Sequence, residues 1–297
     1  METNKKPIIL TDSSADLKDE MYKEIGVERL SLSYTIDGEE FFDNSLDADT
    51  KAFYDKMRAG KIPLTSQINT QTFFDYFEKM VPLGRPIIYI GFSSKLSATY
   101  SSGAKAVEMI LEKYPDTVIT AIDTKCASGG QGLLPFYAAQ MRDEGKSYEE
   151  IVTWIEENKY RAHHWVFVDD LNYLKRGGRL SAAEAFFGNI LSIKPLIWMD
   201  AEGKLTPYAK ERGKKKVLKA MVDRIAENIE DAENQTVFIC HSDYPEGAKE
   251  LKAMIEERVK LSDVRYNYIG TVIGSHTGPG ILALFFMGKD RRNITAQ

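Results

Sequence analysis

Residues 86–103, with the sequence PIIYIGFSSKLSATYSSG, join a strand pattern to a helical pattern through a turn rich in hydroxyl groups. The apolar run 86–90 predicts a buried strand, and the apolar spacing over 104–111 predicts a helix. Such a turn collects free N–H donors and short hydroxyls at the positive end of a helix dipole. It is therefore either a helix cap or an anion site.

Other predicted strands end in turns of similar composition. Residues 7–10 form an apolar strand that leads into Thr11-Asp12-Ser13-Ser14, and Thr65-Ser66-Gln67 stands before the helical run 70–80. Open α/β sheets bind ligands at the carboxyl ends of their strands, where these turns lie. The repeated pattern favours an anion site over simple caps.

The first half of the chain alternates strands with helices. Residues 1–160 are therefore expected to form an α/β domain whose mainly parallel sheet is flanked by helices. Residues 30–42 interrupt the alternation as a hairpin that turns at Asp37-Gly38. The glycines of residues 129–132 lack the third glycine of a dinucleotide fingerprint, so we interpret them as the tightly packed start of a helix.

The second half changes character. At 297 residues the chain is long for one compact core, and residues 161–297 are expected to form a second α/β domain with a mixed sheet. This domain includes an antiparallel pair over 191–208 and a helix from Ser181 to 187. A strand at 265–272 is expected to end in a glycine-rich turn, and the apolar run 281–287 fits either a strand or a helix.

Composition limits the class of protein. The formal net charge of -5 argues against a general nucleic-acid binder, and no apolar run reaches the ~18 residues of a transmembrane helix. The start METNKK lacks a signal-peptide core, and Cys126 and Cys240 match no metal or redox spacing. We expect a cytoplasmic protein with no transmembrane segment.

Several kinds of enzyme site are missing from the sequence. There is no P-loop for ATP, and the stretch 91–95, GFSSK, fails the last position of a G-x-S-x-G nucleophile elbow. No histidine pair has the helical spacing of zinc ligands; His163 and His164 are adjacent and read as ordinary strand or surface residues. We expect neither a metal nor a cofactor.

What remains is a set of uncharged donors near the strand ends. Hydroxyl and N–H groups bind a carboxylate without a fixed cation, and the glycine-rich setting of residues 274–280 lets the backbone approach a ligand. The candidate residues are Thr65, Ser66, Ser93, Ser94, Ser97, Thr99 and His276.

Seven motifs in this chain together resemble the DegV family, whose best-understood members are the fatty-acid-binding subunits of bacterial fatty acid kinase. They are TDSSADL at 11–17, LTSQ at 64–67, SSKLSATYSSG at 93–103, DTKCASGGQG at 123–132, DLNYLKRGGRLS at 170–181, IKPLI at 193–197 and GSHTGPG at 274–280. The chain departs from the family pattern at Lys95 and Ala98, where glycine is common. If position 95 needs a positive φ, lysine there is strained by roughly 1 kcal/mol.

The resemblance implies two α/β domains with a long-chain fatty acid between them. Thr65, Ser97 and His276 would hold the carboxylate, with Ser66, Ser93 and Ser94 close by. The chain itself would be non-catalytic, because a separate ATP-dependent kinase subunit would convert the carboxylate to an acyl phosphate for phospholipid synthesis.

The basic segment 210–216 is either a solvated face or a docking site for an acidic or phosphate-bearing surface. The resemblance favours the kinase as partner, with Arg176, Arg179 and Arg212 at the contact; nucleic acid is not expected, because no aromatic interleaving or known motif is present. Two other functions stay open: an acyl hydrolase or transferase that uses Ser97 and His276, and a regulatory protein that senses lipid.

Overall fold

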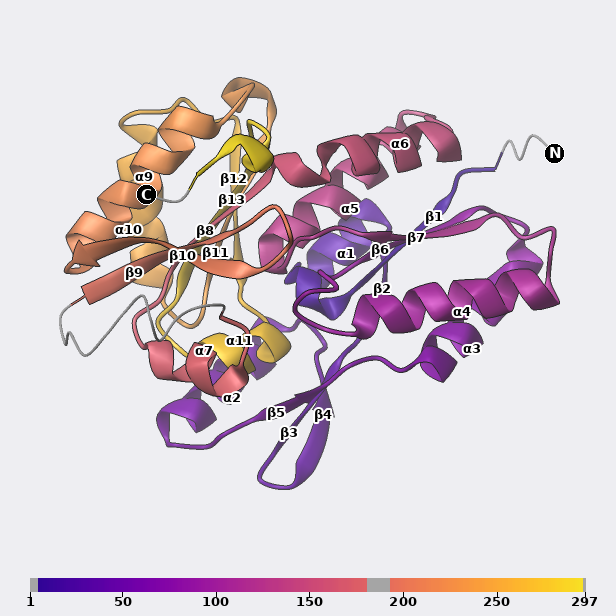
Figure 1. Ribbon diagram of the computed structural model, residues 1–297, viewed down its shortest axis with the longest axis horizontal. Coiled ribbons are helices and arrows are strands. Elements are labelled where there is room, and N and C mark those ends of the chain that lie inside the picture. The colour runs from indigo at the N-terminus through magenta and orange to yellow at the C-terminus, as the bar shows by residue number, and fades with distance from the viewer. Residues whose placement is uncertain (1–4, 181–192, 296–297) are drawn as a thin grey trace.

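The first half of the chain builds a four-stranded parallel sheet with the order β2-β1-β6-β7 (Figure 1). The computed structural model describes residues 5–180 and 193–295. Three of the four strands, β1, β6 and β7, are short and mainly apolar runs, and the sheet is expected to be parallel because helices separate its strands in sequence. The strands are β1 (Ile8–Asp12), β2 (Glu28–Leu30), β6 (Ile87–Gly91) and β7 (Ile119–Asp123).

Helices cover both faces of this sheet. The core on one face joins strand residues such as Ile9 and Ile90 to α1 (Asp19–Ile25), α5 (Ser128–Asp143) and α6 (Tyr148–Asn158). The core on the other face joins Leu10 and Tyr89 to α3 (Thr70–Met80) and α4 (Thr99–Lys113). The expected parallel sheet flanked by helices is confirmed.

The second half forms a mixed sheet with the order β10-β9-β8-β13-β11-β12. Among the strands of the described ranges, β11 and β12 pair in parallel and the other neighbours pair antiparallel, so the expected mixed sheet is confirmed. The run 281–287 resolves as a strand that pairs antiparallel to both of its neighbours. The strands are β8 (Ala162–Phe167), β9 (Ile193–Met199), β10 (Leu205–Arg212), β11 (Thr236–His241), β12 (Asp263–Tyr268) and β13 (Leu282–Met287).

Helix α5 lies between the two sheets. Its residues belong to one buried cluster that contains Ile9 of β1 as well as Phe285 of β13. A Cβ at Gly129 would lie 2.7 Å from the Phe285 ring, and one at Gly130 would overlap the His164 ring. The close-packing interpretation of these glycines is confirmed. The other face of the second sheet is covered by α9 (Lys214–Asn228) and α10 (Pro245–Glu256).

A third, small sheet has the order β4-β3-β5 and lies beside α2 (Asp47–Arg58). Its strands are β3 (Ser33–Ile36), β4 (Glu39–Phe42) and β5 (Leu64–Ser66). The predicted hairpin is confirmed, and Asp37 and Gly38 both have positive φ, as a type I′ turn requires. The pairing of Thr65 with Tyr34 was not predicted.

One expected turn is a helix. The prediction that a strand over 265–272 leads into a glycine-rich turn is wrong, because β12 ends at Tyr268 and α11 (Thr271–Thr277) follows. Packing against α7 (Leu171–Gly177) stabilises this short helix despite its glycine, and Gly278, with a φ of 79°, ends it. The helix expected from Ser181 lies outside the described residues.

The boundary proposed near residue 160 falls in the 3₁₀ turn η3 (Lys159–Arg161), before the first strand of the second sheet. The other 3₁₀ turns are η1 (Ser13–Ala15), η2 (Val81–Leu83), η4 (Ala232–Asn234) and η5 (Arg291–Asn293). Within the described ranges, the helices are too short or too polar to cross a bilayer.

Candidate functional site

A cavity of about 290 Å³ lies where the two halves of the chain meet. The small sheet, the strand end after β6 and the start of α5 form one side, and α7, β10 and α11 form the other. Its polar lining residues are Ser14, Thr65, Ser66, Gln67, Ser97, Arg179, His276 and Thr277. The volume is near the lower end of the usual range of about 300–1,000 Å³ for small-molecule sites.

The polar end is organised by a hydrogen bond across the two halves. Thr65 Oγ1 on β5 lies 2.8 Å from His276 Nε2 in the last turn of α11. A backbone hydrogen bond between the His276 ring and Gly177 places the ring proton on Nδ1, so Nε2 accepts from the Thr65 hydroxyl. Thr65 and His276, 211 residues apart in sequence, are thus joined by one hydrogen bond at the polar end of the cavity.

His276 is neutral near pH 7. Burial and, to a smaller extent, the positive charge of Arg179 lower the pKa of its imidazole to about 4, although the hydrogen bond to Gly177 partly opposes them. With its proton on Nδ1, the neutral ring offers only an acceptor at Nε2, so it donates to an anion only after it takes up a proton or changes tautomer. A Cβ at position 177 would lie 2.5 Å from Nδ1, so glycine is needed for this contact.

Ser97 joins the same cavity from the turn before α4. Its Oγ accepts from the Thr99 N–H at 3.2 Å and lies 3.0 Å from Thr99 Oγ1. The Ser97 hydroxyl can therefore donate a hydrogen bond either to Thr99 or to a ligand. Ser66 also lines the cavity, so four of the six predicted carboxylate residues come together: Thr65, Ser66, Ser97 and His276.

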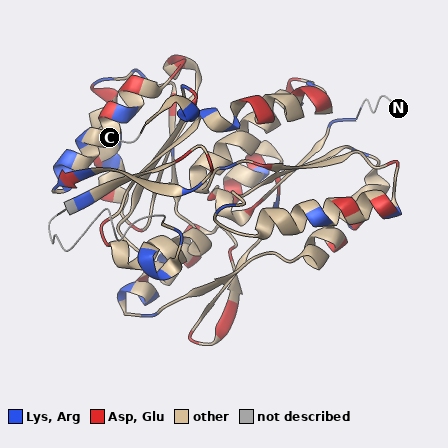
Figure 2. Ribbon diagram, viewed as in Figure 1, with Lys and Arg blue, Asp and Glu red and all other residues tan. Residues whose placement is uncertain are grey.

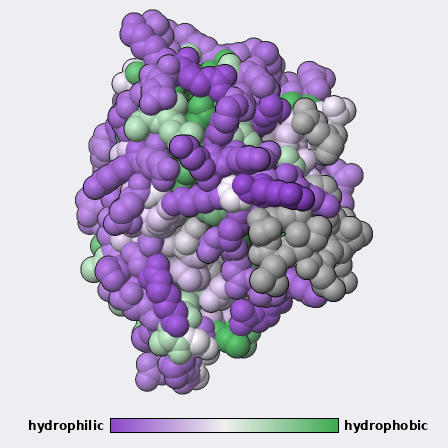
Figure 3. Space-filling view, turned by 90° about the vertical axis from the view of Figure 1, so that its left-hand side faces the viewer, coloured by the Kyte–Doolittle hydropathy of each residue, from purple (hydrophilic) through white to green (hydrophobic). Residues whose placement is uncertain are grey.

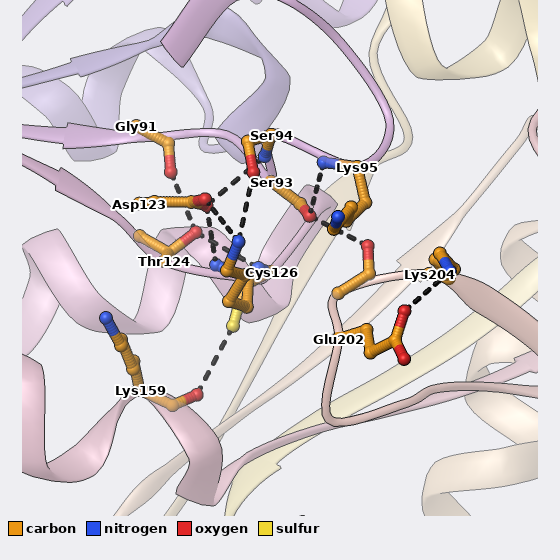
Figure 4. A network of polar contacts seen from close by, with 12 residues as sticks. Gly91, Ser93, Ser94, Lys95, Asp123, Thr124, Cys126, Lys159, Glu202 and Lys204 are labelled. Carbon is orange, nitrogen blue, oxygen red and sulfur yellow. Dashed lines mark hydrogen bonds and ion pairs between the residues drawn. The ribbon is translucent and has the colours of Figure 1, made fainter. Parts of the chain in front are cut away.

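The other two predicted residues serve the loop rather than the cavity (Figure 4). Ser93 is fully buried, and its Oγ donates to the carbonyl of Gly203 at 2.7 Å. Ser94 Oγ accepts from Lys125 Nζ at 3.0 Å, and Lys125 also pairs with Asp123 at 2.6 Å. Ser93 thus ties the turn after β6 to the β9–β10 connection, and neither serine lines the cavity.

Lys95 neither strains the turn nor reaches the cavity. It has no positive φ, so the conditional expectation of strain does not apply. Its side chain is exposed and is not part of the cavity lining. Lysine in place of the family's glycine is therefore compatible with this backbone.

The polar cavity continues into a smaller apolar one of about 40 Å³. The two share the lining residues Ala127, Leu174, Leu205, Ile273 and Thr277. The apolar cavity is also lined by Val166, Ile197, Phe285 and His164. His164 is neutral there: burial lowers its pKa well below the usual value, and its ring lies between the Ala162 carbonyl and the Ala127 N–H.

These apolar wall residues were not singled out in the sequence. Leu174, Leu205, Ile273 and Phe285 come from four separate elements, and an apolar residue in an α/β protein is ordinarily part of the core. Only their arrangement around one space distinguishes them, and the sequence carries no local sign of that arrangement.

The three arginines proposed for partner docking occupy different places. Arg179 lines the cavity; its Nε donates to Leu96 O at 3.3 Å and its Nη1 to Gly177 O at 2.6 Å. Arg176 lies over the Tyr173 ring on α7, and Arg212 is exposed at the end of β10. Figure 2 shows basic residues on α7 and where β10 joins α9. The described surface on that side of the molecule is mostly hydrophilic (Figure 3).

The structure does not place Ser97 and His276, the pair considered for a hydrolase, in contact with each other. Among the described residues, the Ser97 hydroxyl contacts Thr99 and the His276 ring contacts Thr65 and Gly177, so Ser97 and His276 do not form a hydrogen-bonded pair. No cluster of three or more metal-binding side chains occurs in the described ranges either. The arrangement suits binding of an anion with an apolar tail.

Comparisons with known proteins agree with this geometry. The family model "Uncharacterised protein, DegV family COG1307" matches residues 6–289. DegV domain-containing protein CPE0026 of Clostridium perfringens is 48% identical over 289 residues, which cover 97% of this chain and 99% of that protein.

Solved structures are similar over almost the full length. A DegV lipid binding protein from Thermotoga maritima matches with a TM-score of 0.85 and 27% identity, covering 97% of this chain and 100% of that one. A stearic acid-binding protein from Eubacterium ventriosum matches with a TM-score of 0.81 and 27% identity, covering 95% and 98%.

Proposed function

The chain belongs to the DegV family, and on that premise we propose that it binds a long-chain fatty acid, with the carboxylate at Thr65, Ser66, Ser97 and His276. The observation that carries the proposal is the Thr65–His276 hydrogen bond at the polar end of a cavity that continues into an apolar one. Similarity to proteins that bind lipid and stearic acid supports it.

The two ends of such a ligand would contribute unequally to affinity. About 14 buried methylenes at ~0.8 kcal/mol each give roughly 11 kcal/mol before ordering costs. Each hydrogen bond to the charged head adds only about 1.5–3 kcal/mol. The tail would therefore supply most of the affinity, and the hydroxyl groups and His276 would fix the position of the carboxylate.

We further propose that the chain presents this carboxylate to a separate ATP-dependent kinase in the cytoplasm. The kinase would transfer the terminal phosphoryl group of ATP to a carboxylate oxygen, which gives an acyl phosphate for phospholipid synthesis and ADP. The exposed Arg176, Arg179 and Arg212 would meet the acidic or phosphate-bearing surface of that partner. The position of Arg179 at the cavity supports a contact close to the head group.

Lipid analysis tests the binding step. The protein is purified and denatured, and the extract is analysed by mass spectrometry; in parallel, lipid-free protein is titrated with stearic acid. We expect a co-purified long-chain acid and saturable binding. If both are absent, the carrier function is wrong, and turnover of acyl esters that is lost in Ser97→Ala would instead indicate an enzyme.

A further inference from the structure

The turn between β9 and β10 reaches from the second half of the chain onto the first. We call this turn, with one residue on each side, the strap (residues 199–205). Gly203 in the strap has a φ of 86°, and an added Cβ there would overlap the Ser93 hydroxyl and lie 3.0 Å from Lys125 Cα. Ser93 and Lys125 belong to the loops that follow β6 and β7. Glycine therefore lets the strap approach both loops closely.

One buried hydrogen bond joins the strap to the turn after β6 (residues 92–97). Ser93 Oγ donates to the carbonyl of Gly203 at 2.7 Å, and Ser93 is fully buried (Figure 4). As the structure describes these two segments, it is the one direct hydrogen bond between them. Without the Ser93 hydroxyl, the Gly203 carbonyl would lose this partner in a buried place, which is costly. The contact between strap and turn thus depends on Ser93.

This contact is part of the cavity wall. Phe92 and Leu96 of the turn belong to one buried apolar cluster with Met199 of the strap, and Leu205 packs against it. Phe92, Leu96 and Leu205 line the polar cavity, and Leu205 lines the apolar cavity as well. The wall is here a contact between two segments that are distant in sequence. Separation of the strap from the turn would therefore open both cavities.

The turn that Ser93 begins also carries a candidate head-group residue. The Ser93 carbonyl accepts from the N–H groups of Leu96 and Ser97 at 3.0 and 3.3 Å. The hydroxyl that binds the strap and the hydroxyl of Ser97 therefore belong to one hydrogen-bonded turn. Lys95 of the turn and Glu202 of the strap are exposed, so the contact reaches the surface of the protein.

The other side of the strap is held more firmly. The buried guanidinium group of Arg291 donates from Nε to Asp200 O at 3.2 Å and from Nη2 to Lys125 O at 2.7 Å. Its Nη1 donates to Ala162 O at 3.0 Å, at the start of β8. Hydrogen bonds from a charged donor are stronger than one from a hydroxyl group. The contact with Ser93 is therefore the weaker attachment of the strap.

We propose that Ser93 holds the strap closed and thereby sets the rate at which a fatty acid enters and leaves the cavity. Its hydroxyl bonds to Gly203 and lines neither cavity, so its loss would favour the open arrangement equally with and without ligand. Entry and exit would then accelerate together, and Kd would stay nearly the same. This inference rests on the proposed function and makes Ser93 a positioning residue for ligand exchange.

The experiment measures the exchange of stearic acid. Protein loaded with radiolabelled stearic acid is mixed with excess fatty-acid-free albumin to obtain the dissociation rate, and calorimetric titration of lipid-free protein gives Kd. Ser93→Ala removes the hydroxyl, and Gly203→Ala disrupts the same contact from the side of the strap. Ser242→Ala is the matched control: Ser242 is equally buried and its Oγ accepts from Ile281 N at 2.7 Å, but it lines neither cavity.

We expect Ser93→Ala and Gly203→Ala each to raise the dissociation rate roughly tenfold while Kd changes less than about threefold. Ser242→Ala should lower the free energy of unfolding and change neither the rate nor Kd. An unchanged rate in Ser93→Ala, or an equal rise in Ser242→Ala, would overturn the proposal while fatty-acid binding stands.

A rise in Kd that matches the rise in dissociation rate would also overturn it, because Ser93 would then act on the bound state alone. If Ser93→Ala does not fold, Gly203→Ala decides by the same criteria. Failure of the unmodified protein to bind stearic acid would overturn the proposed function itself.

Discussion

Replacing Thr65 by valine separates head-group binding from folding. Valine keeps the shape and the strand preference of threonine on β5 but removes the hydroxyl that lies 2.8 Å from His276 Nε2. The folded protein without ligand loses one hydrogen bond between neutral groups, which is worth about 0.5–1.5 kcal/mol. The bound state loses a hydrogen bond to a carboxylate, which is worth about 1.5–3 kcal/mol.

The structure favours the lower end of the binding loss. Thr65 donates to His276 in the unliganded site, so it must give up that bond when it turns toward a carboxylate. We therefore expect Thr65→Val to weaken fatty-acid binding about tenfold, which corresponds to about 1.4 kcal/mol. The tail contacts remain, so binding is reduced and not abolished.

Calorimetric titration with stearic acid and urea unfolding of the lipid-free protein measure the two effects. Thr236→Val is the matched control, because Thr236 also lies on a strand and its hydroxyl contacts Asp263, yet it lines neither the polar nor the apolar cavity. The control should lose stability with unchanged affinity. Unchanged affinity in Thr65→Val would refute the assignment of Thr65 to the head group.

Three further substitutions test the position of the His276 ring, the apolar cavity and the buried carboxyl group of Asp43. Gly177→Ala places a Cβ 2.5 Å from His276 Nδ1, and we expect roughly tenfold weaker fatty-acid binding; an unchanged Kd would show that the ring position is unimportant. Val166→Phe fills the apolar cavity, so each methylene excluded from it should cost stearic acid about fourfold in affinity relative to myristic acid, and an unchanged ratio of the two Kd values would place the tail elsewhere. Burial raises the pKa of the Asp43 carboxyl group to about 6 in the folded protein. The stability that the protonated carboxyl group gives to the folded protein is therefore present at low pH and is lost as the pH rises through 6. Asp43→Asn should therefore raise the free energy of unfolding at pH 8, by up to about 3 kcal/mol, and by progressively less as the pH falls below 6; an equal gain at pH 8 and pH 4 would contradict this reasoning.

The local parts of the fold were predictable because their signals are local. Apolar runs followed by polar turns identified the parallel strands, and Asp37-Gly38 identified the hairpin, since few other pairs accept two positive φ values. The hydroxyl groups at the strand ends also pointed to the region of the cavity. The assignment of Ser97, Thr65 and His276 to the head group came from the family resemblance and stays a prediction.

The non-local parts could not be derived from the sequence. β5 has only three residues, and its pairing with β3 depends on tertiary packing that no short pattern encodes. That pairing nevertheless holds Thr65 opposite His276. The same limit explains α11, where the glycines of residues 274–280 suggested a turn although contacts with α7 stabilise a helix.

The position of the cavity between the two halves of the chain would make a bound ligand part of the interior of the protein. A fatty acid there would touch α5, β10 and α11 at once, so occupancy would stabilise the native state by mass action. At a free ligand concentration of 100 times Kd the gain is about 2.7 kcal/mol. Proteases that act on transiently opened chains would then remove empty molecules faster than filled ones, and the supply of lipid would set how long each copy survives in the cell.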